Sequence, residues 1–273
     1  MPDRPALPWP TGPDPAPLYL GILNVTPDSF SDGGRFRDPA LALAQARHLV
    51  AQGAGVLDVG AESTRPEATP VSPEEEWARL EPVLLLLRSA LPQIPISLDT
   101  RHGRVAERGL RCGVSIINDV CGCSDPLLLQ AVRASDCGII AMRSRMAGDR
   151  FAMPPYDLPG PSDPAVAVAE LAVVKDRLLA AGIGPGRILL DPGFGFGLSY
   201  AGDLALWEAL PRLPAMLDWP AARFCLGISR KRFLAWRAGT PKLATGERDA
   251  LTASAHRQAT AQGYRVFRTH RVL

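Results

Sequence analysis

The stretch Leu23-Asn24-Val25-Thr26-Pro27-Asp28-Ser29-Phe30-Ser31-Asp32-Gly33-Gly34 joins the end of an apolar run to a segment rich in turn-forming residues. The run Leu18–Leu23 predicts a buried strand, because it is short, apolar and followed by proline, serine and glycine. Asn24 then stands immediately after that strand, next to a buried core, where a polar side chain needs a partner. The stretch therefore predicts a strand that delivers a polar group to a loop.

The same arrangement recurs along the whole chain, with amphipathic stretches between the apolar runs. The runs lack strict polar alternation, as expected of parallel strands that are covered on both faces. Helix starts are marked by a capping residue followed by proline, as in Asp38-Pro39, Ser72-Pro73, Asp125-Pro126 and Asp163-Pro164. Eight strand–helix alternations favour a closed (β/α)8 TIM barrel over an open doubly wound sheet. The predicted strands are Leu18–Leu23, Gly55–Val59, Ile94–Leu98, Val114–Ile117, Gly138–Ala141, Arg187–Leu190, Phe224–Ile228 and Tyr264–Phe267.

The chain length of 273 residues suits one barrel of this kind. Residues 1–17 are rich in proline and are expected to form an irregular lead-in, and residues 18–273 form a single domain. The eighth predicted strand ends near Arg268 and the sequence ends at Leu273, so the helix after strand eight is missing. We expect the apolar surface left there to be covered by the proline-rich N-terminus or by a partner chain.

The composition excludes several classes of protein. A formal net charge of +2 argues against a surface for nucleic acid or for an anionic membrane. No apolar run approaches the roughly 18–20 residues that span a bilayer. The five cysteines form no Cys-x-x-Cys pair, and Cys121-Gly-Cys123 is not followed by the spacing of a zinc site. We expect reduced cysteines in a cytoplasmic protein.

In a barrel of this kind the catalytic groups follow the strands. Most of the predicted strands end in a carboxylate, an amide or a cation, which is hard to produce by chance near a buried core. One group of these residues offers acceptors suited to a flat heterocycle with a row of N–H donors, and Lys231 can answer a ring carbonyl. A second group, which includes Thr64 and Arg65, offers donors and positive charge for a phosphate-type anion. The strand-end residues are Asn24, the Asp58–Arg65 loop, Asp99, Asn118, Arg143, Asp191, Lys231, Arg268 and His270.

Each of these residues also has an ordinary structural interpretation. Asp99 can cap the following helix, and Asp191–Gly197 can be a glycine-rich turn. Lys231 can belong to a solvated basic run, and Asp58 is better explained as a structural carboxylate than as a ligand contact. If the two groups are separate, replacing Arg268 should weaken the contribution of the anion and leave binding of a heterocycle without the anion intact.

The motifs resemble those of one known family, the dihydropteroate synthases of folate biosynthesis. The resemblance spans almost the whole chain, from Gly21 to His270. The two most specific motifs are Gly21–Gly34 and Asp58–Pro66, and the shorter ones follow in the correct order. Those shorter motifs are Ser97–Thr100, Ile117–Val120, Leu190–Gly197 and Gly227–Lys231.

The resemblance implies a transferase that joins (7,8-dihydropterin-6-yl)methyl diphosphate to 4-aminobenzoate, releasing diphosphate. It implies pterin binding by Asp99, Asn118, Asp191 and Lys231. It implies that Asn24, Thr64, Arg268 and His270 bind the diphosphate, with Asn24 also on Mg²⁺, and that Asn24, Lys231, Arg268 and His270 are catalytic. It places Phe30, Thr64, Arg65, Pro66, Phe196 and Ser229 around 4-aminobenzoate. A cytoplasmic homodimer, a sulfonamide target and no nucleic-acid or membrane partner are further expectations.

The chain departs from the family pattern after strand five, where Met142-Arg143-Ser144-Arg145 replaces the usual Met-His. These arginines either contact the ligand or turn outward. After strand eight the family's Arg-Val-His-Asp becomes Arg268-Thr269-His270-Arg271. One alternative is a methyltetrahydrofolate-binding barrel of the corrinoid methyltransferases, which has no need for diphosphate-binding residues. Another is a non-catalytic pterin-binding paralogue, supported only by the changed loop and the missing helix.

Overall fold

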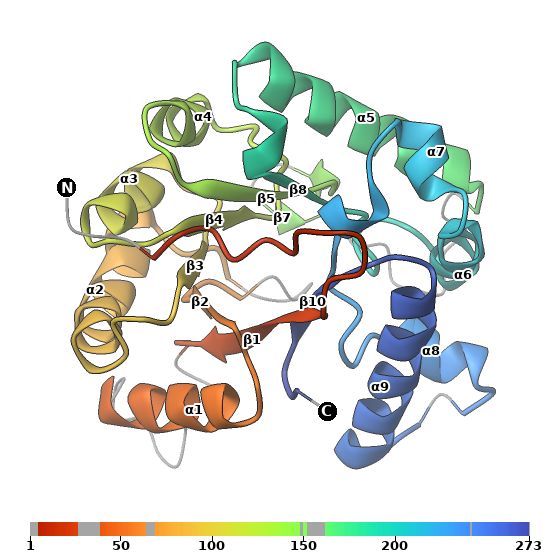
Figure 1. The fold of residues 1–273 in the computed structure, drawn as a ribbon, viewed down its shortest axis with the longest axis horizontal. Helices are drawn as coiled ribbons and strands as arrows, with labels where there is room; N and C mark the ends of the chain where they lie inside the picture. Colours follow the sequence, from red (N-terminus) through yellow and green to blue (C-terminus); the bar gives the residue numbers. More distant parts are fainter. Residues whose placement is uncertain are drawn as a thin grey trace.

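The computed structural model describes residues 5–26, 39–63, 69–147, 150–151, 162–240 and 242–272. Eight parallel strands form a nearly closed barrel surrounded by helices, as the sequence predicts (Figure 1). Their order is β8-β5-β4-β3-β2-β1-β10-β9, and a parallel bridge between Leu190 and Phe224 brings the two ends of the sheet together. The strands are β1 (Leu18–Asn24), β2 (Val56–Gly60), β3 (Ile96–Asp99), β4 (Ile116–Asp119), β5 (Gly138–Met142), β8 (Ile188–Asp191), β9 (Cys225–Leu226) and β10 (Val266–Thr269).

The helices begin where the capping signals predict. Ser72, Asp125 and Asp163 each accept a hydrogen bond from a backbone N–H of the first turn, and a proline follows each of them. Asp38 lies outside the described residues. The helices are α1 (Pro39–Ala51), α2 (Pro73–Ala90), α3 (Gly103–Arg111), α4 (Pro126–Arg133), α5 (Pro164–Ala180), α6 (Tyr200–Ala209), α7 (Leu213–Leu217), α8 (Arg232–Arg237) and α9 (Thr245–Ala261). No helix of the described chain is both long and apolar enough to cross a membrane.

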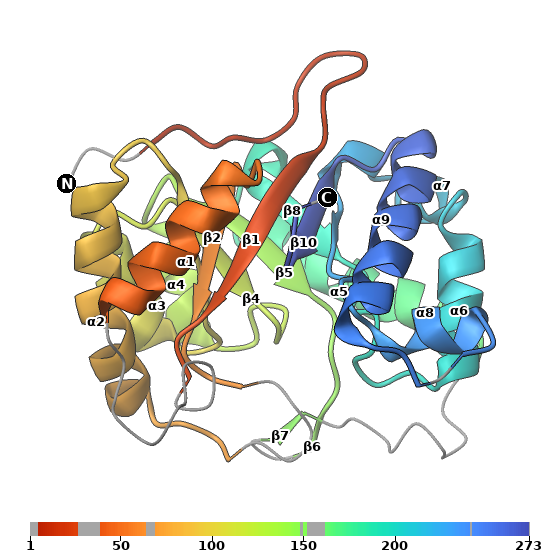
Figure 2. The ribbon, with the colours of Figure 1, turned by 90° about the horizontal axis from the view of Figure 1, so that it is seen from below.

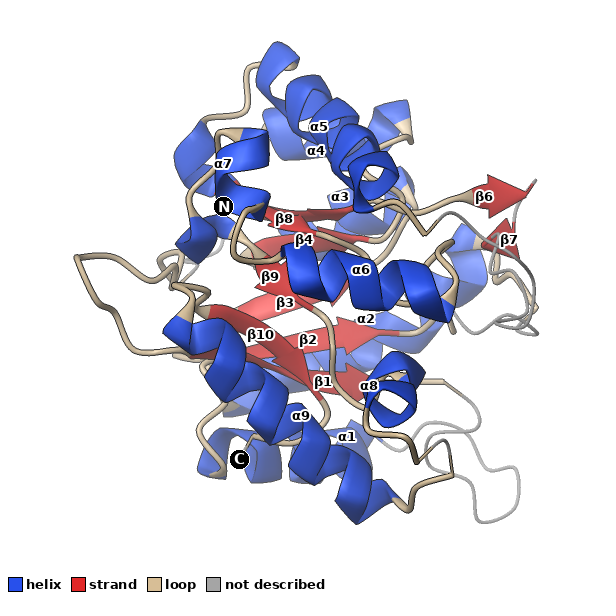
Figure 3. Ribbon diagram, turned by 90° about the vertical axis from the view of Figure 1, so that its right-hand side faces the viewer, coloured by secondary structure: helices blue, strands red, loops and turns tan. Residues whose placement is uncertain are grey.

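Two short strands were not predicted from the sequence. β6 (Met146–Ala147) and β7 (Arg150–Phe151) form an antiparallel hairpin after β5. The hairpin stands apart from the barrel, beyond the carboxyl ends of the strands (Figures 2 and 3). It therefore extends the loop after strand five, the one in which this chain departs from the family pattern.

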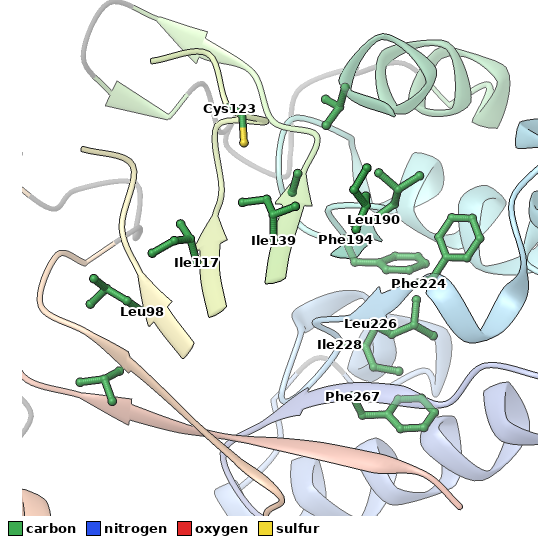
Figure 4. Packing of buried hydrophobic residues seen from close by; sticks show 14 of the residues in the cluster. Leu98, Ile117, Cys123, Ile139, Leu190, Phe194, Phe224, Leu226, Ile228 and Phe267 are labelled. Atoms are coloured by element: carbon green, nitrogen blue, oxygen red, sulfur yellow. The ribbon is translucent and has the colours of Figure 1, made fainter. Parts of the chain in front are cut away.

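The main core lies between the strands and the surrounding helices. Successive strands contribute apolar side chains to this layer, as Leu98, Ile117, Ile139 and Leu190 show (Figure 4). Each of these side chains is completely buried. Full burial of such a side chain contributes roughly 1.5–3 kcal/mol, so this layer supplies most of the driving force for the barrel.

A second, smaller core fills the inside of the barrel. It contains inward-facing side chains from seven strands together with Trp9 of the N-terminal segment. Side chains alternate between the two faces of a strand, so the next inward residue lies two positions further along. That step leads from Val56 to Asp58, from Ile116 to Asn118 and from Val266 to Arg268. The strand residues of this core are Leu20, Val56, Ile116, Ile140, Leu189, Cys225 and Val266.

No helix follows β10 within the described residues, as the sequence predicts. The N-terminal segment does not cover the side of β1 and β10, because it runs across the amino ends of the strands (Figure 2). There Trp9 is 6% exposed and packs against the inner core. Of the two expected coverings, the N-terminus or a partner chain, the described N-terminal residues do not provide the first. On that side Tyr19 packs against His256 of α9 and Phe267, with ring centroids 5.8 Å away in each case.

Candidate active site

The polar layer at the carboxyl ends of the strands is organised around Arg268 of β10. Its Nε donates to Asp58 Oδ2 at 2.6 Å and its Nη2 donates to Asp99 Oδ2 at 2.7 Å. Asn118 Nδ2 lies 3.2 Å from Asp58 Oδ2 and donates to the same carboxylate. The structure thus joins Arg268, predicted for the anion, directly to Asp99 and through Asp58 to Asn118, both predicted for the heterocycle. The two predicted groups share one network.

Asp58 has the structural position that the sequence favours for it. Its side chain is completely buried and lies between Arg268 and Asn118. A buried carboxylate is stable only when it is paired and hydrogen-bonded. Asp58 therefore holds the side chains that face the barrel mouth.

Burial changes the protonation of this network. It raises the pKa of Asp99 to about 7, an effect that Arg268 opposes and that the neighbouring Asp58 reinforces. Burial alone would lower the pKa of the Arg268 guanidinium, but Asp58 and Asp99 raise it above its ordinary value. Arg268 is therefore a permanent cation, and its charge favours the ionised form of Asp99.

Close backbone packing makes room for these carboxylates. Gly60 ends β2 beside Asp99, and a Cβ atom at position 60 would lie 3.1 Å from the Cβ of Asp99. A Cβ atom at position 227 would lie 3.1 Å from Asp191 Oδ2. Both distances are shorter than ordinary contacts, so a larger residue at either position would push the neighbouring carboxylate aside by a few tenths of an ångström.

Asp191 and Lys231 form the second part of the site. Asp191 Oδ1 accepts from the N–H of Gly193 at 2.8 Å. Lys231 places its Nζ 4.2 Å from the centroid of the Phe196 ring, close enough for a cation–π interaction. Burial raises the pKa of Asp191 to about 6 and lowers the pKa of Lys231 to about 8, although Asp191 and Asp203 favour the charged lysine.

The basic run around Lys231 divides between the site and the surface. Arg230 has a positive φ of 59° and turns towards α9, where its Nε donates to Asp249 Oδ1 at 2.6 Å. Arg232 is exposed. Lys231 lies between them and over the Phe196 ring, so the interpretation of Lys231 as part of a solvated basic run is wrong.

His270 and Ser229 meet at the edge of the same mouth. Ser229 Oγ lies 3.0 Å from His270 Nδ1, and the backbone N–H of His270 donates to Ser229 Oγ at 3.2 Å. Burial lowers the pKa of His270 to about 3, and Arg268, Arg230 and Lys231 lower it further. The imidazole is therefore neutral in the ligand-free protein and offers a hydrogen bond rather than a charge.

Asn24 is the remaining predicted site residue that the structure describes. Asn24 ends β1, is exposed, and is paired in register with Gly60. Phe30, Thr64, Arg65 and Pro66 lie outside the described residues. Within the described chain, no three His, Cys, Asp or Glu side chains are grouped so that they could hold a metal ion.

The sequence missed one residue beside the site and left another unassigned. Asp203 of α6 accepts from the N–H of Gly195 with both carboxylate oxygens at 3.0 Å, and burial raises its pKa to about 7. In sequence it is only an acid in a first helical turn, which needs no further explanation. Arg143, expected either to contact the ligand or to turn outward, instead has its side chain buried beneath the loop after Asp191.

The chain matches known proteins along nearly its whole length. The model of the family described as "Pterin binding enzyme" matches residues 20–270. The dihydropteroate synthase of Neisseria meningitidis serogroup C is 40% identical over 262 residues, which cover 94% of this chain and 88% of that protein. The Xanthomonas albilineans dihydropteroate synthase with 4-aminobenzoic acid has a TM-score of 0.81 and 38% identity, covering 94% of this chain and 88% of that one. Its complex with 7,8-dihydropteroate has a TM-score of 0.77 and 35% identity, with the same coverage.

Proposed function

This chain belongs to the pterin-binding enzyme family, among its dihydropteroate synthases, and from that premise we propose how its residues divide the work of the reaction. The enzyme is a transferase of folate biosynthesis. It condenses (7,8-dihydropterin-6-yl)methyl diphosphate with 4-aminobenzoate to give 7,8-dihydropteroate and diphosphate. The methyltransferase-type barrel and the non-catalytic paralogue are therefore set aside.

The observation that carries the proposal is the polar layer of Asp99, Asn118, Asp191 and Lys231 around Arg268 at the barrel mouth. We assign the pterin ring to this layer. Asp58 holds the amide nitrogen of Asn118, which leaves the amide oxygen to accept from a ring N–H. Asp191 keeps one carboxylate oxygen for the amino-pyrimidine edge, and Lys231 answers the ring carbonyl.

Arg268, His270, Asn24 and Thr64 are assigned to the diphosphate. In the reaction the bond between the pterin methylene carbon and the diphosphate oxygen breaks, and the arylamine nitrogen bonds to that carbon and loses a proton. Negative charge grows on the leaving diphosphate, where the Arg268 guanidinium and a His270 N–H stabilise it. The arylamine is neutral at working pH, so the step requires no strong base.

The donors present fit a Mg²⁺ ion that arrives with the diphosphate. Mg²⁺ prefers oxygen ligands, keeps several waters and is commonly held by substrate phosphates and only one or two protein groups. Asn24 offers one amide oxygen at the exposed end of β1, and the described residues offer no acidic cluster for a protein-only site. When bound, the ion neutralises charge on the leaving diphosphate.

We assign 4-aminobenzoate to the side of the mouth that contains Phe196 and Ser229, together with Phe30, Thr64, Arg65 and Pro66. Phe196 is 8% exposed and packs with Val120 and Met142 under Lys231, which gives a flat apolar wall for an aromatic ring. A sulfonamide that mimics 4-aminobenzoate would compete there.

We also propose that the enzyme is a cytoplasmic homodimer. All five cysteines are free thiols, as in a reducing compartment. Trp236 of α8 is 43% exposed and stacks on Tyr200 of α6. A large exposed aromatic side chain is a candidate contact for a second copy of the chain. Sedimentation of the wild type and of Trp236→Ser tests this: a wild-type monomer at micromolar concentration contradicts it.

The assignments are tested with purified enzyme, both substrates and Mg²⁺, following diphosphate release. We expect Asn118→Leu to raise the Kd for a diphosphate-free pterin, and His270→Leu to lower turnover much more than pterin affinity. Removing Mg²⁺ with a chelator should stop turnover and leave binding of the diphosphate-free pterin unchanged. Loss of that binding on chelation would contradict the assignment of the ion to the diphosphate.

A further inference from the structure

We propose that Arg143 is a positioning residue for both substrates, because its guanidinium holds the loop 192–197 that carries Phe196. Its Nη1 donates to the carbonyl oxygens of Pro192 at 3.1 Å and Gly193 at 3.3 Å. Its Nη2 donates to the carbonyl oxygen of Phe196 at 2.6 Å. One side chain therefore gathers three carbonyls of a single loop.

The position of Arg143 is itself tightly determined. Its backbone N–H bonds to the carbonyl of Asp191 at 3.3 Å, which extends the pairing of β5 and β8 by one residue. A Cβ atom at position 193 would lie 2.3 Å from the Arg143 carbonyl oxygen, so only glycine permits this close approach. The side chain is 1% exposed. Arg143 is thus a fixed support beneath the loop.

The buried charge is compensated at the outer end of the side chain. Glu170 of α5 accepts from Arg143 Nε through Oε2 at 2.8 Å and from Arg145 Nε through Oε1 at 2.7 Å. A buried guanidinium without such a partner would be costly. With Nε of Arg143 bonded to Glu170, the Nη1 and Nη2 groups of Arg143 are free to donate to the loop carbonyls. A lysine cannot reproduce this arrangement, because its ammonium is a single compact group without the planar fork of the guanidinium.

The same loop is held from its other side by carboxylates. The N–H of Gly193 donates to Asp191 and the N–H of Gly195 donates to Asp203. The carbonyls of the loop therefore accept from the Arg143 guanidinium, and two of its N–H groups donate to the carboxyl groups of Asp191 and Asp203. Both carboxyl groups also favour the charged form of Lys231. The backbone geometry of residues 192–197 is determined by these opposite charges.

Holding this loop sets the geometry of the substrate site. The carbonyl of Phe196 is bonded to Arg143, and the Phe196 ring lies under the Lys231 ammonium. Asp191 immediately precedes the loop and accepts a hydrogen bond from the N–H of Gly193, its second residue. Loss of Arg143 would release both the aromatic wall for 4-aminobenzoate and a carboxylate for the pterin. The inference rests on the assignment of these residues under Proposed function.

The test compares Arg143→Met with Arg187→Met. Arg187 also donates to backbone carbonyls, of Cys137 at 2.7 Å and Val132 at 2.6 Å, but at the amino end of β8. We expect Arg143→Met to lower kcat/KM about 10²-fold, mainly through KM for both substrates, because small displacements of positioned groups have effects of that size. Arg187→Met should lose stability and keep both KM values.

Two further variants make the outcome decisive. If Arg143→Met does not fold, Arg143→Lys should still raise both KM values and accelerate hydrogen exchange of the Gly193 and Phe196 amides. Unchanged KM values in a folded Arg143 variant would overturn the inference. Phe196→Leu tests the role of Arg143 separately from the placement of 4-aminobenzoate at Phe196. If Phe196→Leu raises KM for 4-aminobenzoate and the Arg143 variants do not, only the role of Arg143 is refuted. If neither raises KM, the site assignment fails as well.

Discussion

Replacing Arg268 with methionine would test the shared network at the barrel mouth. Methionine retains most of the side-chain volume and removes the cation that bonds to Asp58 at 2.6 Å and Asp99 at 2.7 Å. Removing one partner of a buried ion pair typically costs about 3–5 kcal/mol, because the remaining charge is left uncompensated. Asp58 is completely buried, and among the described residues its side chain keeps the bond from Asn118. We therefore expect a loss of stability in this range.

The loss should depend on pH with a definite sign. Burial already raises the pKa of Asp99, and Arg268 is the group that opposes this rise. Without Arg268, the folded protein is more stable when the buried carboxyl group of Asp99 is protonated than when it is charged, because the charge has lost its partner. The stability difference between wild type and variant should therefore shrink as the pH falls, as measured by urea unfolding at neutral and at mildly acidic pH.

The variant also separates one shared network from two independent groups. Independent groups predict that Arg268→Met lowers turnover and leaves binding of a diphosphate-free pterin intact. The observed contacts predict that pterin affinity falls too, because Asp99 loses its cation and Asp58, which holds Asn118, loses the same cation. The double variant Arg268→Met with Asp58→Asn removes the orphaned charge and should recover part of the stability. Unchanged stability and unchanged pterin affinity in Arg268→Met would refute the reasoning.

Three other predictions follow from the same geometry. Asp191→Ala leaves pterin donors and the Gly193 N–H without an acceptor, at a cost of about 1–3 kcal/mol. Calorimetry should therefore show pterin affinity about tenfold weaker, and unchanged affinity would show that the pterin ring is not bound at Asp191. Burial lowers the pKa of Lys231 to about 8, so the ammonium is lost as the pH rises through that value. We expect kcat/KM to fall above that pH, and the pH–rate profile of Lys231→Gln should lack this alkaline decrease. Trp9→Ala empties the amino end of the barrel and should reduce the free energy of unfolding by about 3–5 kcal/mol with KM unchanged; a large change in KM would show that the inner core also shapes the site.

The strands and the residues at their ends could be predicted because their signals are local. Eight short apolar runs coincide with the eight barrel strands to within two residues at each end. In a barrel the residue after each strand must lie at one common face, so Asp99, Asn118 and Asp191 could be placed at one site without knowing any contact. The helix caps Ser72 and Asp163 are local in the same sense.

The partners of these residues could not be predicted, because they depend on how the barrel closes. Arg268 bonds to Asp58 and Asp99 only because β10 lies beside β1 and the stagger of the strands brings the three side chains into one layer. The sequence left Arg143 between contacting the ligand and turning outward, since the position of a buried arginine depends on the carbonyls and the Glu170 carboxylate around it. Trp9 likewise has no strand pattern, and its position inside the barrel depends on the space left by Gly138.

The sequence by itself determined the barrel, the order of its strands along the chain and the polar residues at their carboxyl ends. The physical reason is that apolar spacing and capping act over a few residues, and strand ends converge whatever the details of packing. The tertiary structure alone decided which cation meets which carboxylate, which arginine supports the loop after Asp191 and what fills the amino end of the barrel. Those choices depend on burial and distance between residues far apart in the chain, which no local pattern encodes.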